Sequence, residues 1–126
     1  MLAVAARLRA SDDFRRTVRQ GVRVARPTLV VHARTHHSPP GVPSTQVGFV
    51  VSKSVGGAVV RNRVKRRLRH LSRPLVESSS DLHVVVRALP AAASATSDTL
   101  ASDLAGAWQA TVRRLSTSTP ARGTAP

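Results

Sequence analysis

The chain has 126 residues, a formal net charge of +14 and no cysteine. This length can bury one core, and a hydrophobic content of 41% is too high for a disordered chain. The lack of cysteine excludes disulfide frameworks and thiolate metal sites, and no apolar run is long enough to span a membrane. The excess positive charge indicates a polyanionic partner, with nucleic acid favoured over an anionic membrane surface.

A short helix is predicted first, over residues 12–20. Ser11 is expected to be its N-cap, acidic side chains occupy the first turn, and Gly21 is expected to end it. Phe14 and Val18 stand one turn apart, so they share a face from which the arginines of this segment are absent.

Two strands separated by a proline-rich loop follow. Residues 28–34 and 46–53 are rich in β-branched residues, which favours strands. Residues 35–45 contain three prolines and a glycine, which is typical of a loop. Residues 22–26 are compatible with a further short strand.

The segment AVVRNRVKRRLRHL, residues 58–71, predicts a basic helix that packs against a sheet. On a helical wheel it has one narrow apolar stripe, made by Val60, Val64, Leu68 and Leu71. Lysine and arginine flank this stripe on both sides. The residues expected to point away from the sheet are Asn62, Arg66 and Arg69.

Two ordinary explanations of this helix fit poorly. A solvated surface helix usually alternates the sign of its charges, whereas here like charges stand three and four residues apart, at a cost of a few tenths of a kcal/mol per pair. A helix that lies on a membrane surface needs a wider apolar face with aromatic residues. The pattern therefore favours a surface that holds a polyanion.

A third strand and a long helix complete the fold. Residues 72–81 are expected to form a loop, residues 82–88 a strand and residues 98–115 a helix. The last helix has an apolar stripe that should face the core, made by Leu100, Leu104, Trp108, Val112 and Leu115. The order α-β-β-α-β-α predicts an α+β fold, with one domain over 1–115 and a disordered tail over 116–126.

Residues 47–71, VGFVVSKSVGGAVVRNRVKRRLRHL, resemble the signature of the bacterial ribonuclease P protein subunit. This signature is a strand ending in V-S-K, a turn that contains glycine, and A-V-x-R-N-R-x-K-R-x-x-R on a helix. The flanking DDFRRTVRQG and DLHVVVRA also match the family, so that the resemblance covers roughly residues 6–115. It implies a small α/β sandwich with a left-handed β-α-β crossover through the basic helix, whereas such crossovers are in general right-handed.

The resemblance also implies the partners. In this family the protein binds a large catalytic RNA, and together they remove the 5′ leader of precursor tRNA. The RNA carries the active site and its Mg²⁺, so the protein itself is expected to bind no cofactor or metal. No membrane or protein partner is inferred.

Positions that match the family's motifs give the expected site residues. Those expected to bind RNA are Lys53, Arg61, Asn62, Arg63, Lys65, Arg66, Arg67, Arg69 and Arg87. Those expected to line a cleft for the leader are Phe14, Val18, His32, Val50 and Ser52. Two of these positions, Val18 and His32, depart from the aromatic residues that are usual in the family. Because base stacking is worth about 1–3 kcal/mol per base, leader binding is expected to depend more on charge here.

No residue is expected to be catalytic. The six acids are scattered, apart from Asp12 and Asp13 at a helix start, and a two-metal nuclease needs clustered carboxylates. His36 and His37 lie in a proline-rich loop, which is poor support for an acid and base pair. The protein alone is therefore expected to be inactive. A structural RNA-binding protein, such as a ribosomal protein, and a standalone nuclease remain alternatives.

The first residues, MLAVAARLR, lack the basic start and the long apolar stretch of a signal peptide. A cytoplasmic location is therefore expected.

Overall fold

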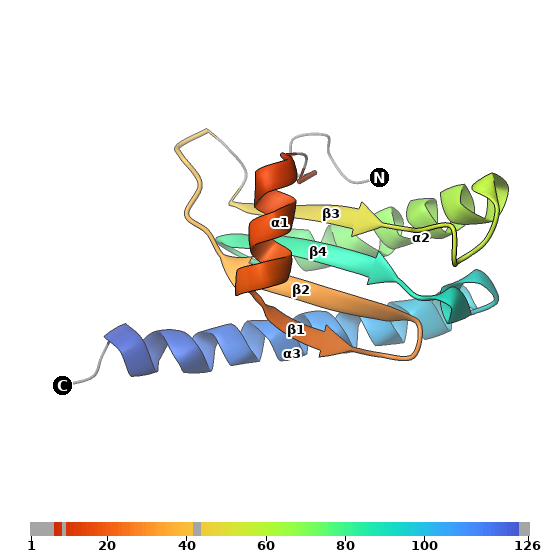
Figure 1. Cartoon of the computed structure of the whole chain (residues 1–126). Coiled ribbons are helices and arrows are strands. Elements are labelled where there is room, and N and C mark those ends of the chain that lie inside the picture. The colour runs from red at the N-terminus through yellow and green to blue at the C-terminus, as the bar shows by residue number, and fades with distance from the viewer. Residues whose placement is uncertain (1–6, 9, 42–43, 124–126) are drawn as a thin grey trace.

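The computed structural model describes residues 7–8, 10–41 and 44–123, and side chains as far as residue 116. The first six residues, on which the expectation about a signal peptide rests, lie outside this part. A four-stranded sheet has α1 on one face and α2 and α3 on the other (Figure 1). The elements are α1 Ser11–Gln20, β1 Val22–Ala25, β2 Leu29–Thr35, β3 Thr45–Val50, α2 Ala58–Glu77, β4 Leu82–Ala88, the 3₁₀ helix η2 Pro90–Ala93 and α3 Ser97–Gly123. The predicted α+β class is confirmed.

The sheet has the strand order β1-β2-β4-β3. β2 pairs antiparallel with β1 and β4, whereas β3 and β4 run parallel and are joined through α2. In Figure 1 both parallel strands point to the right, β4 lies below β3, and α2 runs behind the sheet, which makes this crossover left-handed. The handedness implied by the family resemblance is therefore confirmed.

The main core lies between the sheet and the helices α2 and α3. Alternate strand residues point to this side and are fully buried, among them Val31 of β2 and Val86 of β4. The predicted stripe of the last helix supplies the opposite wall, since Leu100, Leu104 and Trp108 are buried in the same cluster.

The structure corrects four boundaries. Ala10, not Ser11, is the N-cap of α1, and it makes no side-chain cap. The strand expected over 46–53 ends at Val50, because Val55 N–H donates to Ser52 C=O (3.1 Å) and turns the chain. The expected loop over 72–81 begins later than predicted, since α2 continues to Glu77.

The extension of α2 passes through Pro74, which would ordinarily end a helix because proline lacks an N–H. Ser72 is buried here, and Leu75 and Val76 pack against the core, so tertiary contacts outweigh the proline. α3 likewise continues past the expected end at 115 to Gly123. The domain boundary and the tail beyond it stay predictions, and residues 124–126 lie outside the described part.

Candidate nucleic-acid interface

The basic helix α2 is held by its apolar stripe. Val64 and Leu68 are fully buried against the sheet side, while Val60 and Leu71 are partly buried. The start of the helix requires glycine, because Gly56 has φ +157° and a Cβ there would lie 3.0 Å from Val60 Cβ. The remaining faces of α2 are free to carry charge.

The cations of α2 between positions 61 and 69 make no ion pair within the described part of the chain. Asn62, Arg63 and Arg66 are exposed. Arg67 is half-buried, and its Nη1 donates to Ala95 C=O at 3.5 Å, so it is less free than its neighbours. The ion pair that α2 does make, Arg73–Glu77, lies at its far end.

Two hollows flank the basic helix. The first is lined by Arg63, Arg66, Arg67, Arg69 and His70. The second, between α1, β3 and α2, is lined by Arg7, Leu8, Phe14, Val47, Gly48, Phe49, Lys65 and Arg69.

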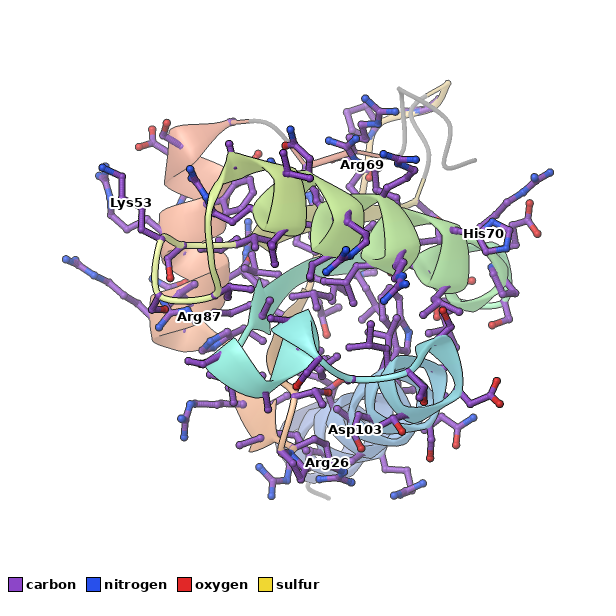
Figure 2. All side chains as sticks on the ribbon, turned by 90° about the vertical axis from the view of Figure 1, so that its right-hand side faces the viewer. Arg26, Lys53, Arg69, His70, Arg87 and Asp103 are labelled. Atoms are coloured by element: carbon purple, nitrogen blue, oxygen red, sulfur yellow. The ribbon has the colours of Figure 1, made fainter. Side chains whose placement is uncertain are left out.

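The prediction that Arg69 points away from the sheet is wrong. Arg69 is half-buried, it lines both hollows, and its Nε is buried without a partner among the described residues (Figure 2). Four residues after Lys65, it stands only about 40° away around the helix, so the two share a side.

Phe14 stands directly on Gly48 of β3. A Cβ at position 48 would collide with the ring, lying 2.7 Å from Cε2 and 2.8 Å from Cε1. The lack of a side chain on Gly48 thus lets the aromatic ring reach the sheet. Phe14 also shares a shallow hollow on α1 with Val18.

The other residues expected to line the leader cleft differ in exposure. Val50 is half-buried at the end of β3, opposite Arg87 of β4, and Ser52 and Lys53 follow in an exposed turn. Figure 2 shows Lys53 and Arg87 on the side of the molecule that carries α1. His32, in contrast, is only 4% exposed and forms part of the floor beneath this side rather than an open wall.

His32 has no hydrogen-bond partner on either ring nitrogen among the described residues. Burial lowers its pKa, and the neighbouring guanidinium groups of Arg87 and Arg23 lower it further. These surroundings therefore favour the neutral form of the imidazole.

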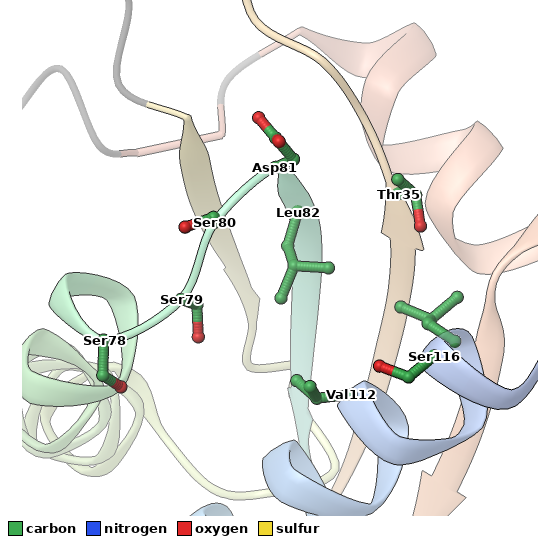
Figure 3. Close-up of a pocket in the computed structure, with 9 residues that line it drawn as sticks. Thr35, Ser78, Ser79, Ser80, Asp81, Leu82, Val112 and Ser116 are labelled. Carbon is green, nitrogen blue, oxygen red and sulfur yellow. The ribbon is translucent and has the colours of Figure 1, made fainter. Parts of the chain in front are cut away.

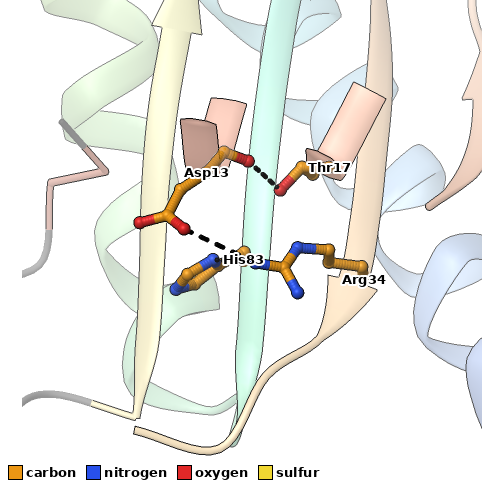
Figure 4. Close-up of polar contacts among 4 residues, drawn as sticks. All are labelled: Asp13, Thr17, Arg34 and His83. Atoms are coloured by element: carbon orange, nitrogen blue, oxygen red, sulfur yellow. Dashed lines mark hydrogen bonds and ion pairs between the residues drawn. The ribbon is translucent and has the colours of Figure 1, made fainter. Parts of the chain in front are cut away.

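A polar network that the sequence reasoning missed fixes α1 to the sheet (Figure 4). Asp13 Oδ1 lies 3.6 Å from Arg34 Nη2, which lies 3.2 Å from His83 Nδ1, and Thr17 Oγ1 donates to Asp13 C=O at 2.8 Å. His36 stacks on His83 with ring centroids 3.8 Å apart. The sequence indicates Asp13 only as an acid in a first helical turn, and no local pattern points to its distant partner.

The pKa of His83 is lowered to about 4, chiefly by burial and then by the charges of His36 and Arg34, with Asp13 opposing the shift. The loop histidines also have structural contacts, because His37 Nδ1 lies 3.4 Å from Asp81 Oδ2 and His36 stacks on His83. Within the described ranges, no group of three or more His, Asp or Glu side chains could hold a metal ion. None of the helices in these ranges is long and apolar enough to cross a membrane.

A further pocket lies between the end of α2, the start of β4 and α3 (Figure 3). Its walls carry hydroxyl groups from Ser78, Ser79 and Ser80 above an apolar floor that includes Leu82 and Val112. The Ser79 hydroxyl accepts from Trp108 Nε1 at 3.0 Å and donates to the Leu75 carbonyl at 2.7 Å, so it serves the core. No lysine or arginine is among the described residues that line this pocket, so the pocket does not suit a polyanionic ligand.

Comparison with known proteins finds one consistent family. The model of the family described as Ribonuclease P matches residues 2–112. The chain is 52% identical to the ribonuclease P protein component of Streptomyces avermitilis over 86% of the chain and 94% of that protein. It is 51% identical to that of Pseudarthrobacter chlorophenolicus, over 91% of the chain and 83% of that protein. Among solved structures, it resembles the RNase P protein from Staphylococcus aureus with a TM-score of 0.71 and 26% identity, over 88% of the chain and 93% of that protein.

Proposed function

The chain belongs to the bacterial ribonuclease P protein family, and on that premise we propose how it holds its two RNA ligands. The family assignment makes it a protein subunit of ribonuclease P, an endoribonuclease in which the protein alone is not the catalyst. The partner implied is the ribonuclease P RNA. The proposal concerns the surfaces that meet this RNA and the precursor tRNA.

The RNA subunit binds the exposed and flanking sides of α2. The main support for this proposal is the arrangement of α2. Val64 and Leu68 hold the helix against the core, while its cations from 61 to 69 have no carboxylate partner in the described part. Phosphates would relieve the repulsion among these side chains. The proposed contacts are Lys53, Arg61, Asn62, Arg63, Lys65, Arg66, Arg69 and Arg87, with Arg67 in a lesser role because it also holds Ala95.

The 5′ leader of precursor tRNA lies on the α1 side of the sheet. Phe14 offers a ring for stacking, Val18 and Val50 offer apolar contact, and Ser52 offers a hydroxyl beside Lys53. His32 supports this surface from below. Because a single aromatic ring is present in this set, charge has a larger share in leader binding than stacking.

The chemistry of cleavage lies with the RNA-containing holoenzyme, which is proposed to require Mg²⁺. The metal is assigned to the RNA because the protein alone is not the catalyst. The proposed location is the cytoplasm, where precursor tRNA is processed.

Reconstitution with the cognate RNA tests the function. The protein should lower the Mg²⁺ concentration needed for cleavage of precursor tRNA and should not cleave it alone. Failure to stimulate any catalytic RNA would favour a structural RNA-binding protein, and cleavage by rigorously purified protein would indicate a standalone nuclease.

Arg61→Lys and Arg63→Lys test the interface, because each keeps the charge but removes the fork that holds phosphate with two hydrogen bonds. Either variant should bind the RNA subunit more weakly, by about two- to tenfold. Arg114→Lys on α3 is the control and should bind like the wild type. If both α2 variants also bind like the wild type, α2 acts only as bulk charge.

A further inference from the structure

Two exposed arginines flank the buried His32 on the α1 side of the sheet. Arg23 of β1 stands directly opposite His32, and Arg87 of β4 stands opposite Val30. His32 and Val30 are two residues apart in β2, so they and both arginines point to one face.

That face is the one covered in part by α1. His32 pairs with Val85 of β4, Val85 pairs with Gly48 of β3, and Phe14 of α1 stands on Gly48. Arg23 therefore lies on the same side as the proposed leader surface, although it comes from the opposite edge of the sheet.

Both arginines lack a carboxylate partner within the described ranges. The histidine between them is 4% exposed and has no partner for either ring nitrogen there. The backbone at Arg23 is fixed, since its carbonyl accepts from Arg114 Nη1 at 2.8 Å. The result is a pair of guanidinium groups on either side of a buried histidine, with no carboxylate partner for either group in the described part.

We propose that Arg23 is a further leader-binding residue, which holds a backbone phosphate of the single-stranded leader as it crosses the sheet from β3 to β1. The path starts at Val50 and Lys53, passes Arg87 on β4 and ends at Arg23, about three strand spacings or 14 Å away. This inference rests on the proposed leader function and extends the leader surface to the far edge of the sheet.

Arginine suits this position because it can hold a phosphate with two hydrogen bonds or stack its planar group on a base. Phe14 is the one benzene ring among the proposed leader contacts, and His32 is buried. A guanidinium directly opposite His32 adds a contact by charge where the described part of the sheet offers no exposed ring.

The test uses the reconstituted holoenzyme and compares precursor tRNA that carries a leader with 5′-mature tRNA. Arg23→Gln should weaken binding of the precursor about two- to fivefold and leave mature tRNA unchanged. If one phosphate contact is lost, the slope of log K against log salt for the precursor should become shallower by about 0.7. Arg23→Lys should retain the salt slope, because the charge remains.

Arg26→Gln is the matched control. Arg26 comes from the turn after the same strand, but its Nη1 donates to Ala25 C=O and its Nε would lie 3.6 Å from a Cβ on Gly106 of α3. Figure 2 shows it near Asp103, far from Arg87. Arg26→Gln should bind precursor and mature tRNA like the wild type.

The outcomes separate the inference from its premise. If the wild type prefers precursor over mature tRNA and Arg23→Gln keeps that preference in full, the inference is wrong and the leader function stands. Equal weakening of both tRNAs by Arg23→Gln, or an equal effect of Arg26→Gln, also overturns it. If the wild type shows no preference at all, the proposed leader contact itself fails, and the inference fails with it.

Discussion

At the scale of single residues, the surroundings of a side chain decide its role more than its type does. His32 and His83 both lie in strands and point to the α1 side, yet His83 contacts Arg34 and His36, whereas His32 has no hydrogen-bond partner in the described part. Arg63 is exposed, whereas Arg67 is half-buried and donates to the Ala95 carbonyl in the loop between η2 and α3. A list of basic residues is therefore not yet a list of RNA contacts.

Gly48→Ala should destabilise the protein by about 1–3 kcal/mol, because the new methyl group would overpack against the Phe14 ring. Denaturant unfolding measures this cost. In a Phe14→Ala background the ring is gone, so the cost of Gly48→Ala should largely disappear. An equal cost in both backgrounds would show that the ring is not what excludes a side chain at position 48.

At the scale of elements, α2 combines a stable docking stripe with an unfavourable charged surface. Its first turn contains no acid, and its N-cap Gly57 makes no side-chain cap. Like charges three and four residues apart add repulsion of a few tenths of a kcal/mol per pair. The helix is kept in place by buried Val64, Leu68 and Ser72, so it presents its cations at a cost that an anion can offset.

Sulfate should therefore raise the melting temperature of the free protein more than chloride does at equal ionic strength. Sulfate also stabilises proteins generally by exclusion from their surface. The double substitution Arg63→Gln and Arg66→Gln separates the two effects, since only a bound anion depends on these side chains. The excess effect of sulfate should shrink in this variant, measured by thermal unfolding in both salts. An unchanged excess would indicate general exclusion.

At the scale of the whole molecule, α1 and the sheet face beneath it are coupled by the network around His83. Asp13, Arg34 and His36 face this imidazole from three different elements or loops. The net charge of +14 adds repulsion everywhere, and it grows as histidines gain protons. Stability should therefore depend on pH through a buried group that resists protonation.

The sign follows from the two pKa values of His83. The folded-state pKa is about 4, and the unfolded value is about 6.5. Between these values the unfolded chain binds the proton more readily, so stability should fall as pH decreases from about 6.5 to 4, by up to about 3 kcal/mol. His32 has a lowered pKa as well and acts in the same direction.

Denaturant unfolding across this range of pH should give a flatter profile for His83→Gln than for the wild type, even if the variant is less stable throughout. An unchanged dependence of stability on pH would mean that the pKa of His83 is not lowered in the folded state.

The sequence by itself determined the elements whose signals are local. A run of three valines indicated the strand at 82–88, matched by β4 Leu82–Ala88, and the spacing of apolar residues indicated the docking stripe of the basic helix. The V-S-K and R-N-R motif was long enough to indicate the family, and the family implied the left-handed crossover, which local physics alone would not favour.

Tertiary structure decided what depends on contacts between distant segments. The burial of Ser72 and the packing of Leu75 carried α2 through Pro74, and the hollow between α1, β3 and α2 received Arg69. The register of β1 on β2 placed Arg23 opposite His32. A one-residue shift would move Arg23 to the other face of the sheet, so only the pairing of β1 with β2 brings it beside His32, on the side of the proposed leader surface.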